Sequence, residues 1–325
     1  MKAIIVTRYG GPEVLQVKEI LTPSVKENEV LIKIHVAAVN NTDPVFRKGK
    51  PFISRIFTGL LKPKHSIPGD VLAGEVIVIG KNVTRFKIGD RVYGYTTAAL
   101  GAHAQCICLS ENSAITIIPE NISYEEAAGI VDGGHTALVF LRDKGEVSNK
   151  QKVLIYGASG SIGTAAVQLS NAYGAEVTGV CSTTNIEMIK SLGVNRAIDY
   201  TKNDFTQENI KYDIIFDTVA KKSFSQCKNV LTKNGIYLTT FPTPDVLFKG
   251  IFQSKRRGKR ALFVAAGMKP ANEKIENLQY LSELIKNEKI KTVISKRYSM
   301  DDIALAHRYV ETGHKKGNVI INICQ

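Results

Sequence analysis

The sequence contains no tryptophan and only five cysteines, and these shortages exclude several classes of protein. Cys106, Cys108, Cys181, Cys227 and Cys324 are odd in number and scattered, so they predict neither a disulfide framework nor a zinc ribbon. Cys106 and Cys108 alternate along one predicted strand. A metal pair is conceivable there, but a plain strand face is favoured because no further His or Cys cluster stands nearby. We therefore expect a reduced, cytoplasmic protein.

Long apolar runs are missing as well. No run approaches the length of about 20 residues that a membrane-spanning helix needs. The first residues, Met1 to Val6, begin directly with a strand pattern and carry no apolar core or cleavage site of a secretory signal. We expect no membrane span.

Acidic residues are scarce relative to basic ones, with 30 Asp and Glu against 43 Lys and Arg and a net charge of +13. The sharpest basic cluster, Lys255 to Arg260, lies between two apolar runs and contains a glycine, which favours a solvated loop. No aromatic residues interleave the basic ones, so a nucleic-acid groove is disfavoured. The charge nevertheless keeps an RNA-binding protein open as an alternative function.

A glycine-rich stretch, Lys152 to Gly163, carries the strongest signal. The apolar run Val153 to Tyr156 predicts a buried strand, three glycines spaced three apart follow, and a helical stripe begins at once. Such a turn aims unpaired helix N–H groups at an anion, usually a dinucleotide pyrophosphate, although a purely structural glycine turn is the alternative. The predicted contacts are Gly157, Ala158, Ser159, Gly160, Ser161, Ile162 and Gly163.

The following strand predicts which dinucleotide is bound. Enzymes that prefer NAD usually carry Asp or Glu at its end, but here it ends Cys181-Ser182-Thr183-Thr184-Asn185. Hydroxyls and an amide can donate to a 2′-phosphate, which favours NADPH over NADH. The same residues can also simply cap the next helix, and both roles are compatible.

The order of elements predicts two domains and an α/β fold. Short strands at 3–7, 15–20, 29–39, 71–79, 91–95 and 104–109 indicate a partly closed β-barrel or sandwich. The basic stretch 46–64 is predicted as a loop with one helical turn that could form part of a substrate wall. A helical segment from 124 to 142, interrupted at 133–136, leads into a doubly wound parallel sheet.

That sheet has strands at 153–156, 177–181, 196–200, 213–217, 235–240 and 261–265, and helices at 161–173, 185–192, 203–210 and 221–231. Its edge strand, 261–265, is apolar and predicts a homodimer. The last elements no longer fit this sheet, so the chain is expected to return to the first domain. We predict a β-rich domain at 1–123 and 266–325 and a dinucleotide-binding Rossmann domain at 124–265.

The order and spacing of several motifs resemble the zinc-free branch of the medium-chain dehydrogenase/reductase superfamily, close to quinone oxidoreductases and alkenal or enone reductases. The similarity spans essentially the whole chain. Besides the glycine loop, the matching stretches are 1–4, 38–43, 68–76, 86–94, 133–137, 197–200, 216–218 and 313–318.

This resemblance implies a GroES-like catalytic domain beside the Rossmann domain, with a cleft between them. It also implies hydride transfer from NADPH to a quinone or to the activated double bond of an α,β-unsaturated carbonyl compound; the two acceptors stay open. An NADPH-binding accessory protein on the same fold is the alternative. Zinc-dependent relatives have Cys where this chain has Asn40, and a His-Glu pair where it has Asp70-Val71-Leu72. A tetrahedral zinc site is therefore not expected, and a zinc alcohol dehydrogenase is the least favoured reading.

Three catalytic residues follow from the resemblance. The Asn40 amide could donate to the oxygen on which charge develops. Asp43 matches a family aspartate, or else it caps a turn before Pro44. Thr136 matches a position near the nicotinamide, or else it caps a helix.

The resemblance also assigns further cofactor contacts. Ser182, Thr183 and Asn185 lie where the 2′-phosphate is bound, and Tyr200 lies beside the adenosine phosphate. The family often has Lys or Arg directly after Gly317, where this chain has Asn318, so that Lys315 or Lys316 would replace that contact. The remaining predicted contacts are Thr218 and, at the nicotinamide end, Phe241, Pro242, Phe263, Val264 and Ala265.

Overall fold

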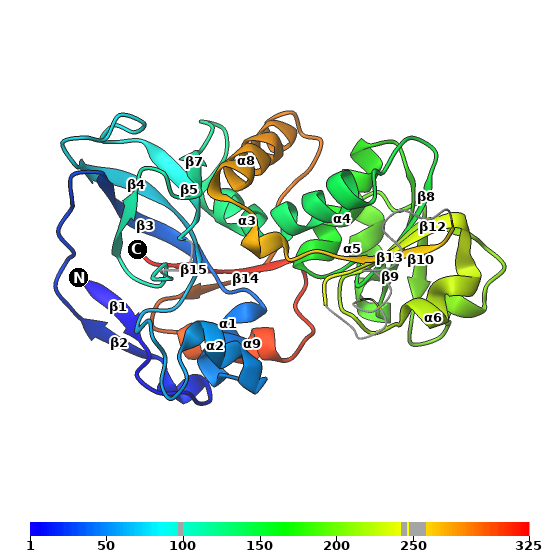
Figure 1. The fold of residues 1–325 in the computed structure, drawn as a ribbon, viewed down its shortest axis with the longest axis horizontal. Helices are drawn as coiled ribbons and strands as arrows, with labels where there is room; N and C mark the ends of the chain where they lie inside the picture. Colours follow the sequence, from blue (N-terminus) through cyan, green and yellow to red (C-terminus); the bar gives the residue numbers. More distant parts are fainter. Residues whose placement is uncertain (97–99, 242–245, 247–257, 325) are drawn as a thin grey trace. The chain divides into compact units, whose positions relative to one another are not determined.

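The computed structural model describes residues 1–96, 100–241, 246 and 258–324. The chain divides into two compact units (Figure 1). Unit 1 comprises Met1–Asp132, Pro270–Lys286 and Thr292–Gln325, and unit 2 comprises Gly133–Lys269 and Asn287–Lys291. Within the described part of the chain, no helix is both long enough and apolar enough to cross a membrane.

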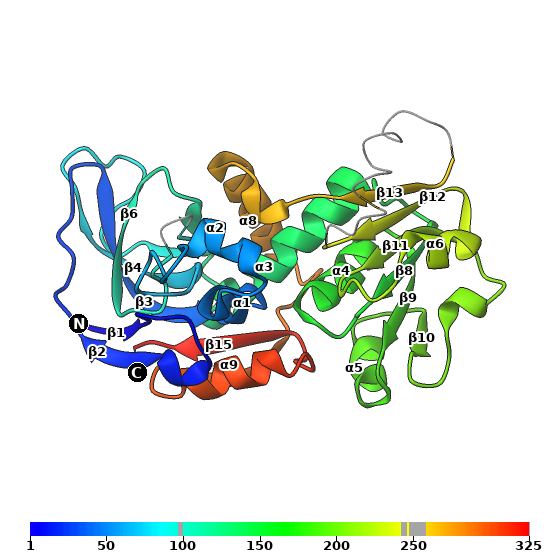
Figure 2. The ribbon, with the colours of Figure 1, turned by 60° about the horizontal axis from the view of Figure 1, so that its bottom comes forward.

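Unit 2 is built on a six-stranded parallel sheet with the order β10-β9-β8-β11-β12-β13. This order reverses between β8 and β11, which confirms the predicted doubly wound fold. Figure 2 shows its strands side by side. The strands are β8 (Lys152–Tyr156), β9 (Glu176–Cys181), β10 (Arg196–Asp199), β11 (Tyr212–Asp217), β12 (Leu231–Thr239) and β13 (Arg260–Phe263), and the helices are α4 (Ser161–Ala172), α5 (Ile186–Ser191) and α6 (Phe224–Cys227).

Two helices expected in unit 2 are much shorter than predicted. The segment 203–210 forms only a 3-10 turn, Phe205–Gln207, whose start is capped by the Asp204 carboxylate accepting from the Thr206 amide. The segment 221–231 forms α6 and a following 3-10 turn, because β12 already begins at Leu231.

The predicted break at residues 133–136 is wrong. Helix α3 runs without interruption from Tyr124 to Leu138 and is followed by a π-helical turn, Val139–Lys144. Gly133 serves close packing instead, because a Cβ there would lie 2.7 Å from the Ser161 carbonyl oxygen. The helix begins in unit 1 and ends in unit 2, whereas the domain boundary expected from the sequence lies at its start.

Unit 1 contains a seven-stranded sheet with the order β14-β15-β3-β4-β5-β7, with β6 also paired to β3, and a separate β1-β2 hairpin. The strands are β1 (Lys2–Ile5), β2 (Gln16–Glu19), β3 (Glu29–Ala38), β4 (Val71–Ile79), β5 (Arg91–Tyr95), β6 (Cys106–Ser110), β7 (Ile115–Ile117), β14 (Ile294–Ser299) and β15 (Asn318–Asn322). Its other helices are α1 (Thr42–Lys48), α2 (Arg55–Thr58), α8 (Ala271–Lys286) and α9 (Ile303–Glu311).

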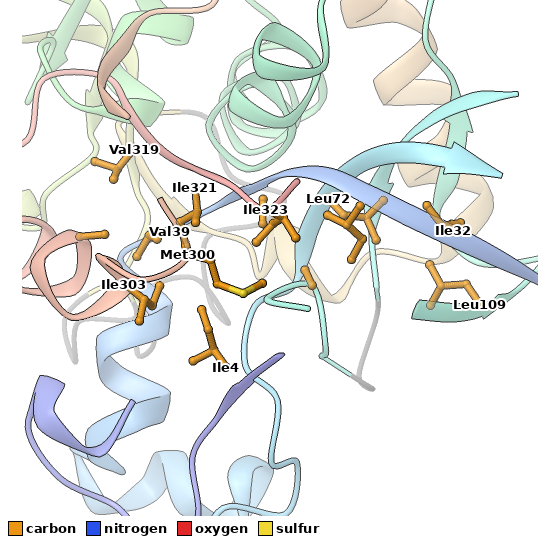
Figure 3. Packing of buried hydrophobic residues seen from close by; sticks show 14 of the residues in the cluster. Ile4, Ile32, Val39, Leu72, Leu109, Met300, Ile303, Val319, Ile321 and Ile323 are labelled. Carbon is orange, nitrogen blue, oxygen red and sulfur yellow. The ribbon is translucent and has the colours of Figure 1, made fainter. Parts of the chain in front are cut away.

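The core of unit 1 joins the two ends of the chain (Figure 3). Ile4 and Ile32 from the N-terminal strands share one buried cluster with Met300, Ile303 and Ile321 near the C-terminus. β15 also pairs antiparallel with β3. The C-terminal elements thus lie in the same unit as the N-terminal strands, and burial of these large side chains stabilises this arrangement.

Candidate functional site

The glycine loop of unit 2 has the geometry that its spacing predicts. Gly157 leaves β8 with φ of +84°, a conformation that favours glycine. Gly163 packs against the loop backbone, since a Cβ there would lie 2.8 Å from the carbonyl carbon of Ala158 and closer still to the Gly157 oxygen. The two glycines hold strand and helix together at the bend.

Gly160 plays a different part. It is the N-cap of α4, with extended backbone (φ −80°, ψ −179°), and a Cβ there would meet no atom of the protein nearer than 3.7 Å. A group could therefore approach Gly160 without a clash, with one contact to the Gly157 oxygen at ordinary van der Waals distance, and the first turn of α4 carries no acidic residue. An open, glycine-lined helix N-terminus at a switch point of the sheet fits a dinucleotide pyrophosphate.

The end of β9 is tied to this loop by Asn185. Its side-chain nitrogen donates to Ser159 Oγ and to Ser182 Oγ, both at 3.1 Å. The Asn185 side chain is buried, and its Oδ1 has no hydrogen-bond partner. The capping alternative for these residues is not seen, because neither Ser182 nor Asn185 makes a side-chain cap bond.

A carboxylate that the local sequence did not reveal lies beside Thr183. Asp199 ends β10 opposite Cys181, and it accepts from Thr183 Oγ1 at 2.5 Å and from Thr201 Oγ1 at 2.7 Å. These bonds lower the pKa of Asp199. Lys202 Nζ lies 4.0 Å from its Oδ2, so a cation also stands at this strand end.

The other predicted contacts in unit 2 follow the carboxyl ends of the remaining strands. Thr218 Oγ1 donates to the Tyr156 carbonyl at 2.9 Å, so it closes the exit of β8. Tyr200 is 47% exposed and Phe241 is 63% exposed, while Phe263 and Val264 are half-buried at the end of β13. Pro242 lies outside the described residues.

Thr136 lies in the last turn of α3 rather than at a helix start, so its capping alternative is wrong. It belongs to unit 2, whereas Asn40 and Asp43 belong to unit 1. Asn318 and Lys316 are also in unit 1. The Asn318 side chain donates to the Val293 carbonyl at 3.0 Å where β15 begins, and Lys316 is exposed.

Asn40 and Asp43 lie in a polar cluster inside unit 1. The Asp43 carboxylate accepts from the Asn40 backbone amide at 2.6 Å, which is the turn-capping role, and both side chains are buried. The Asn40 side-chain amide donates to Asp70 Oδ1 at 3.3 Å. One of the hydrogens expected to meet an acceptor oxygen is thus directed at Asp70.

Three further groups complete this cluster. Lys274 and Lys315 are buried, and the Lys274 ammonium lies 4.8 Å from the centre of the Tyr95 ring. Asp132 is half-buried and interacts electrostatically with both lysines. We call Asn40, Asp43, Asp70, Asp132, Lys274 and Lys315 the unit 1 polar cluster.

The cluster shifts the titration of all its charged groups. Burial raises the pKa of Asp70 to about 6, with a further rise from Asp132. Burial also raises the pKa of Asp43 well above its ordinary value, with Asp70 adding to it. Burial lowers the pKa values of Lys274 and Lys315, which the neighbouring carboxylates oppose. Asp70 can therefore hold or release a proton near neutral pH.

Sequence reasoning missed most of this cluster because its members lie far apart in the chain. One signal was present in α8, where Lys274 occupies the same inward stripe as Leu278 and Leu281. A lysine on a buried stripe needs a carboxylate partner, although the sequence does not say which one. In residues 1–96, 100–241, 246 and 258–324, no group of three or more His, Cys, Asp and Glu could hold a metal ion.

Comparisons with known proteins show the family of the chain. Residues 26–150 match the alcohol dehydrogenase GroES-like domain family, and residues 192–321 match the zinc-binding dehydrogenase family. The chain is 32% identical to the 2-methylene-furan-3-one reductase of Solanum lycopersicum, over 99% of this chain and 79% of the relative. It is 31% identical to the chloroplastic NADPH-dependent alkenal/one oxidoreductase of Arabidopsis thaliana, with the same coverage.

Among solved structures, the quinone oxidoreductase from Coxiella burnetii superposes with a TM-score of 0.87 at 30% identity. The similarity covers 100% of this chain and 99% of that one. The predicted fold class, a Rossmann sheet with a GroES-like domain, is therefore confirmed. The chain is an oxidoreductase and belongs to the quinone oxidoreductase and alkenal/one oxidoreductase branch of the medium-chain dehydrogenase/reductase superfamily.

Proposed function

We propose that the protein transfers a hydride from NADPH to a quinone or to the activated double bond of an α,β-unsaturated carbonyl compound, without zinc. The observation that carries this proposal is the open position above Gly160 at the N-terminus of α4. The names of the relatives supply the two acceptor classes and, in one case, the NADPH dependence. Bound NADPH would supply the hydride. The protein has to bind and orient the reactants and to hold and transfer a proton.

The preference for NADPH rests on the polar end of β9. Ser182 Oγ is held in place by Asn185, and the Lys202 ammonium stands at the neighbouring strand end. Hydroxyl and ammonium groups suit a 2′-phosphate. The Asp199 carboxylate stays charged while it accepts from Thr183 and Thr201, and the Lys202 ammonium, 4.0 Å from its Oδ2, opposes its repulsion of that phosphate. We therefore keep NADPH as the preferred cofactor, with Lys202 as an additional contact.

The unit 1 polar cluster supports the acceptor side of the reaction. Hydride addition to an enone or quinone leaves negative charge on oxygen, which needs hydrogen-bond donors and finally a proton. Asn40 orients the Asp70 carboxyl, and Asp70 exchanges a proton near neutral pH because its pKa is about 6. We assign Asp70 as the group that holds this proton and Asn40 as the residue that positions it.

Steady-state assays with a panel of quinones, alkenals and enones test the proposal. With NADPH as donor, loss of absorbance of the reduced nicotinamide should follow addition of at least one acceptor class. NADH should be a poorer donor. Binding of NADPH without turnover of any acceptor would contradict the reductase function. Stoichiometric zinc in the purified active protein would contradict the zinc-independent mechanism.

Two further features belong to the proposal. β13 is the last strand in the described order of the unit 2 sheet, which supports a homodimer formed through this edge. Light scattering of the purified protein tests this, and a monomer at micromolar concentration would contradict it. We also keep a cytoplasmic location, which fractionation of the source cells would test.

A further inference from the structure

Large apolar side chains gather on the surface of one short segment of unit 1. We call residues 50–64, which contain α2 and the turn after it, the α2 segment. In it, Phe52, Ile56, Leu60 and Leu61 are 65%, 68%, 60% and 89% exposed. Scattered exposed apolar residues need no explanation, but four within ten positions form a concentrated patch.

Helix α2 has polar side chains directed at the protein and an apolar one at solvent, which is the reverse of an ordinary surface helix. Ser54 and Thr58, one turn apart, are buried, and Thr58 Oγ1 donates to the Ser54 carbonyl at 3.2 Å. The Tyr9 hydroxyl lies 2.9 Å from Thr58 Oγ1. Ile56, about 200° around the helix axis from Ser54, faces solvent. A surface helix normally shows its polar side to water, so this arrangement presents apolar groups outward.

The α2 segment is held in this orientation by specific contacts. The Gly59 amide donates to the Arg55 carbonyl at 2.8 Å, and the Lys64 amide donates to the Thr58 carbonyl at 2.6 Å. Arg55 Nε donates to the Gly49 carbonyl at 3.1 Å, and its guanidinium stacks 4.5 Å from the centre of the Tyr9 ring. The apolar patch is therefore presented by a braced turn.

Basic residues flank the patch in the sequence, although two of them, Arg47 and Lys48, form ion pairs with Glu311. Between Asp43 and Asp70 the sequence has no Asp or Glu but six cations: Arg47, Lys48, Lys50, Arg55, Lys62 and Lys64. Lys50, Lys62 and Lys64 are exposed, and within the described residues none of them forms an ion pair. The patch thus combines exposed apolar side chains with lysines that form no ion pair among the described residues.

We propose that the α2 segment docks the protein onto an anionic phospholipid surface. Exposed leucine, isoleucine and phenylalanine side chains can enter the boundary between headgroups and acyl chains, while neighbouring lysines meet the headgroup charge. A polynucleotide would take up the lysines but leave Leu60 and Leu61 in water. A second copy of the chain would bring like charges face to face. The inference is independent of the acceptor that the enzyme reduces.

Vesicle co-sedimentation of the full-length protein tests this proposal. We expect binding to vesicles of phosphatidylcholine with phosphatidylserine, little binding to phosphatidylcholine alone, and weakening with salt because exposed charges are screened. Leu60→Ser/Leu61→Ser should lower the partition coefficient at least about tenfold, as should Lys62→Glu/Lys64→Glu. The control Leu21→Ser/Ile88→Ser alters two other exposed apolar residues and should bind like the wild type.

Several results would overturn the docking role. These are equal binding to both vesicle types, no binding to either, or unchanged binding of Leu60→Ser/Leu61→Ser when its melting temperature matches that of the wild type. Release from vesicles by an RNA homopolymer that itself binds more tightly would point to a nucleic-acid site. A change of oligomeric state or of the acceptor KM in this variant, with vesicle binding unchanged, would assign the patch to a subunit contact or to the acceptor site.

Discussion

Adding one methyl group at Gly160 or at Gly163 should have opposite consequences, although the two positions lie three residues apart. A Cβ at Gly163 would lie 2.8 Å from two backbone atoms of Ala158 and nearer still to the Gly157 oxygen. Ordinary contact begins at 3.4 Å, so Ala158 would have to retreat by 0.6 Å (3.4 minus 2.8) and the Gly157 carbonyl by more. At Gly160 no protein atom lies within 3.7 Å of the new methyl.

The clash at Gly163 sets the size of the first effect. Backbone atoms cannot rotate away, so Gly163→Ala should cost about 1–3 kcal/mol, the usual cost of overpacking. In a unit of this size that lowers the melting temperature by about 2–4 °C per kcal/mol. Gly160→Ala keeps an allowed extended backbone, and the restriction of the unfolded chain offsets the poorer N-cap that alanine makes, so its melting temperature should stay close to that of the wild type.

The order of the two variants in NADPH affinity should be the reverse of their order in stability: Gly160→Ala, the more stable variant, should bind NADPH more weakly than Gly163→Ala. The Gly160→Ala methyl occupies the open space above the N-terminus of α4, where a pyrophosphate would lie, so Kd for NADPH should rise at least about tenfold. Thermal denaturation without nucleotide and fluorescence titration with NADPH measure the two effects separately. The reasoning is refuted if Gly160→Ala binds NADPH like the wild type, or if it loses as much stability as Gly163→Ala.

Three other substitutions test the remaining assignments. Ser182→Asp should weaken NADPH at least about tenfold more than NADH in a titration, because it places a second carboxylate beside the 2′-phosphate; an equal loss contradicts the NADPH preference. The pKa of Asp70, about 6, lies above its ordinary value of 3.8, so the folded state binds this proton more tightly than the unfolded state. The stability that this group contributes is therefore complete below about pH 4 and is lost as the pH rises through 6. Asp70→Asn should therefore melt above the wild type at pH 7.5 but not near pH 4, and equal melting curves at pH 7.5 argue against the shifted pKa. Lys315→Met leaves Asp43 and Asp132 with less compensation and should lower the melting temperature, and adding Asp132→Asn should restore part of the loss, as differential scanning calorimetry would detect.

The sequence by itself determined the features that depend on local spacing. Three glycines after an apolar run were enough to predict a turn between a buried strand and a helix, which the structure shows between Gly157 and Gly163, because such a turn depends on neighbouring residues only. Alternating strands and helices predicted the doubly wound sheet. The departure of the last elements from that pattern predicted the return of the chain, seen in the pairing of β15 with β3.

Only the tertiary structure decided which distant residues meet. Asp70, Asp132 and Lys274 lie on separate segments, so no spacing in the sequence joins them into one cluster. The carboxylate that approaches Thr183 comes from the next strand, through the register of Asp199 with Cys181. The glycine at 133 suggested a break, yet α3 runs through it, and the residue is where the helix packs closely against Ser161. Local spacing sets backbone conformation, whereas burial, charge partners and pKa values come from the neighbours that folding brings together.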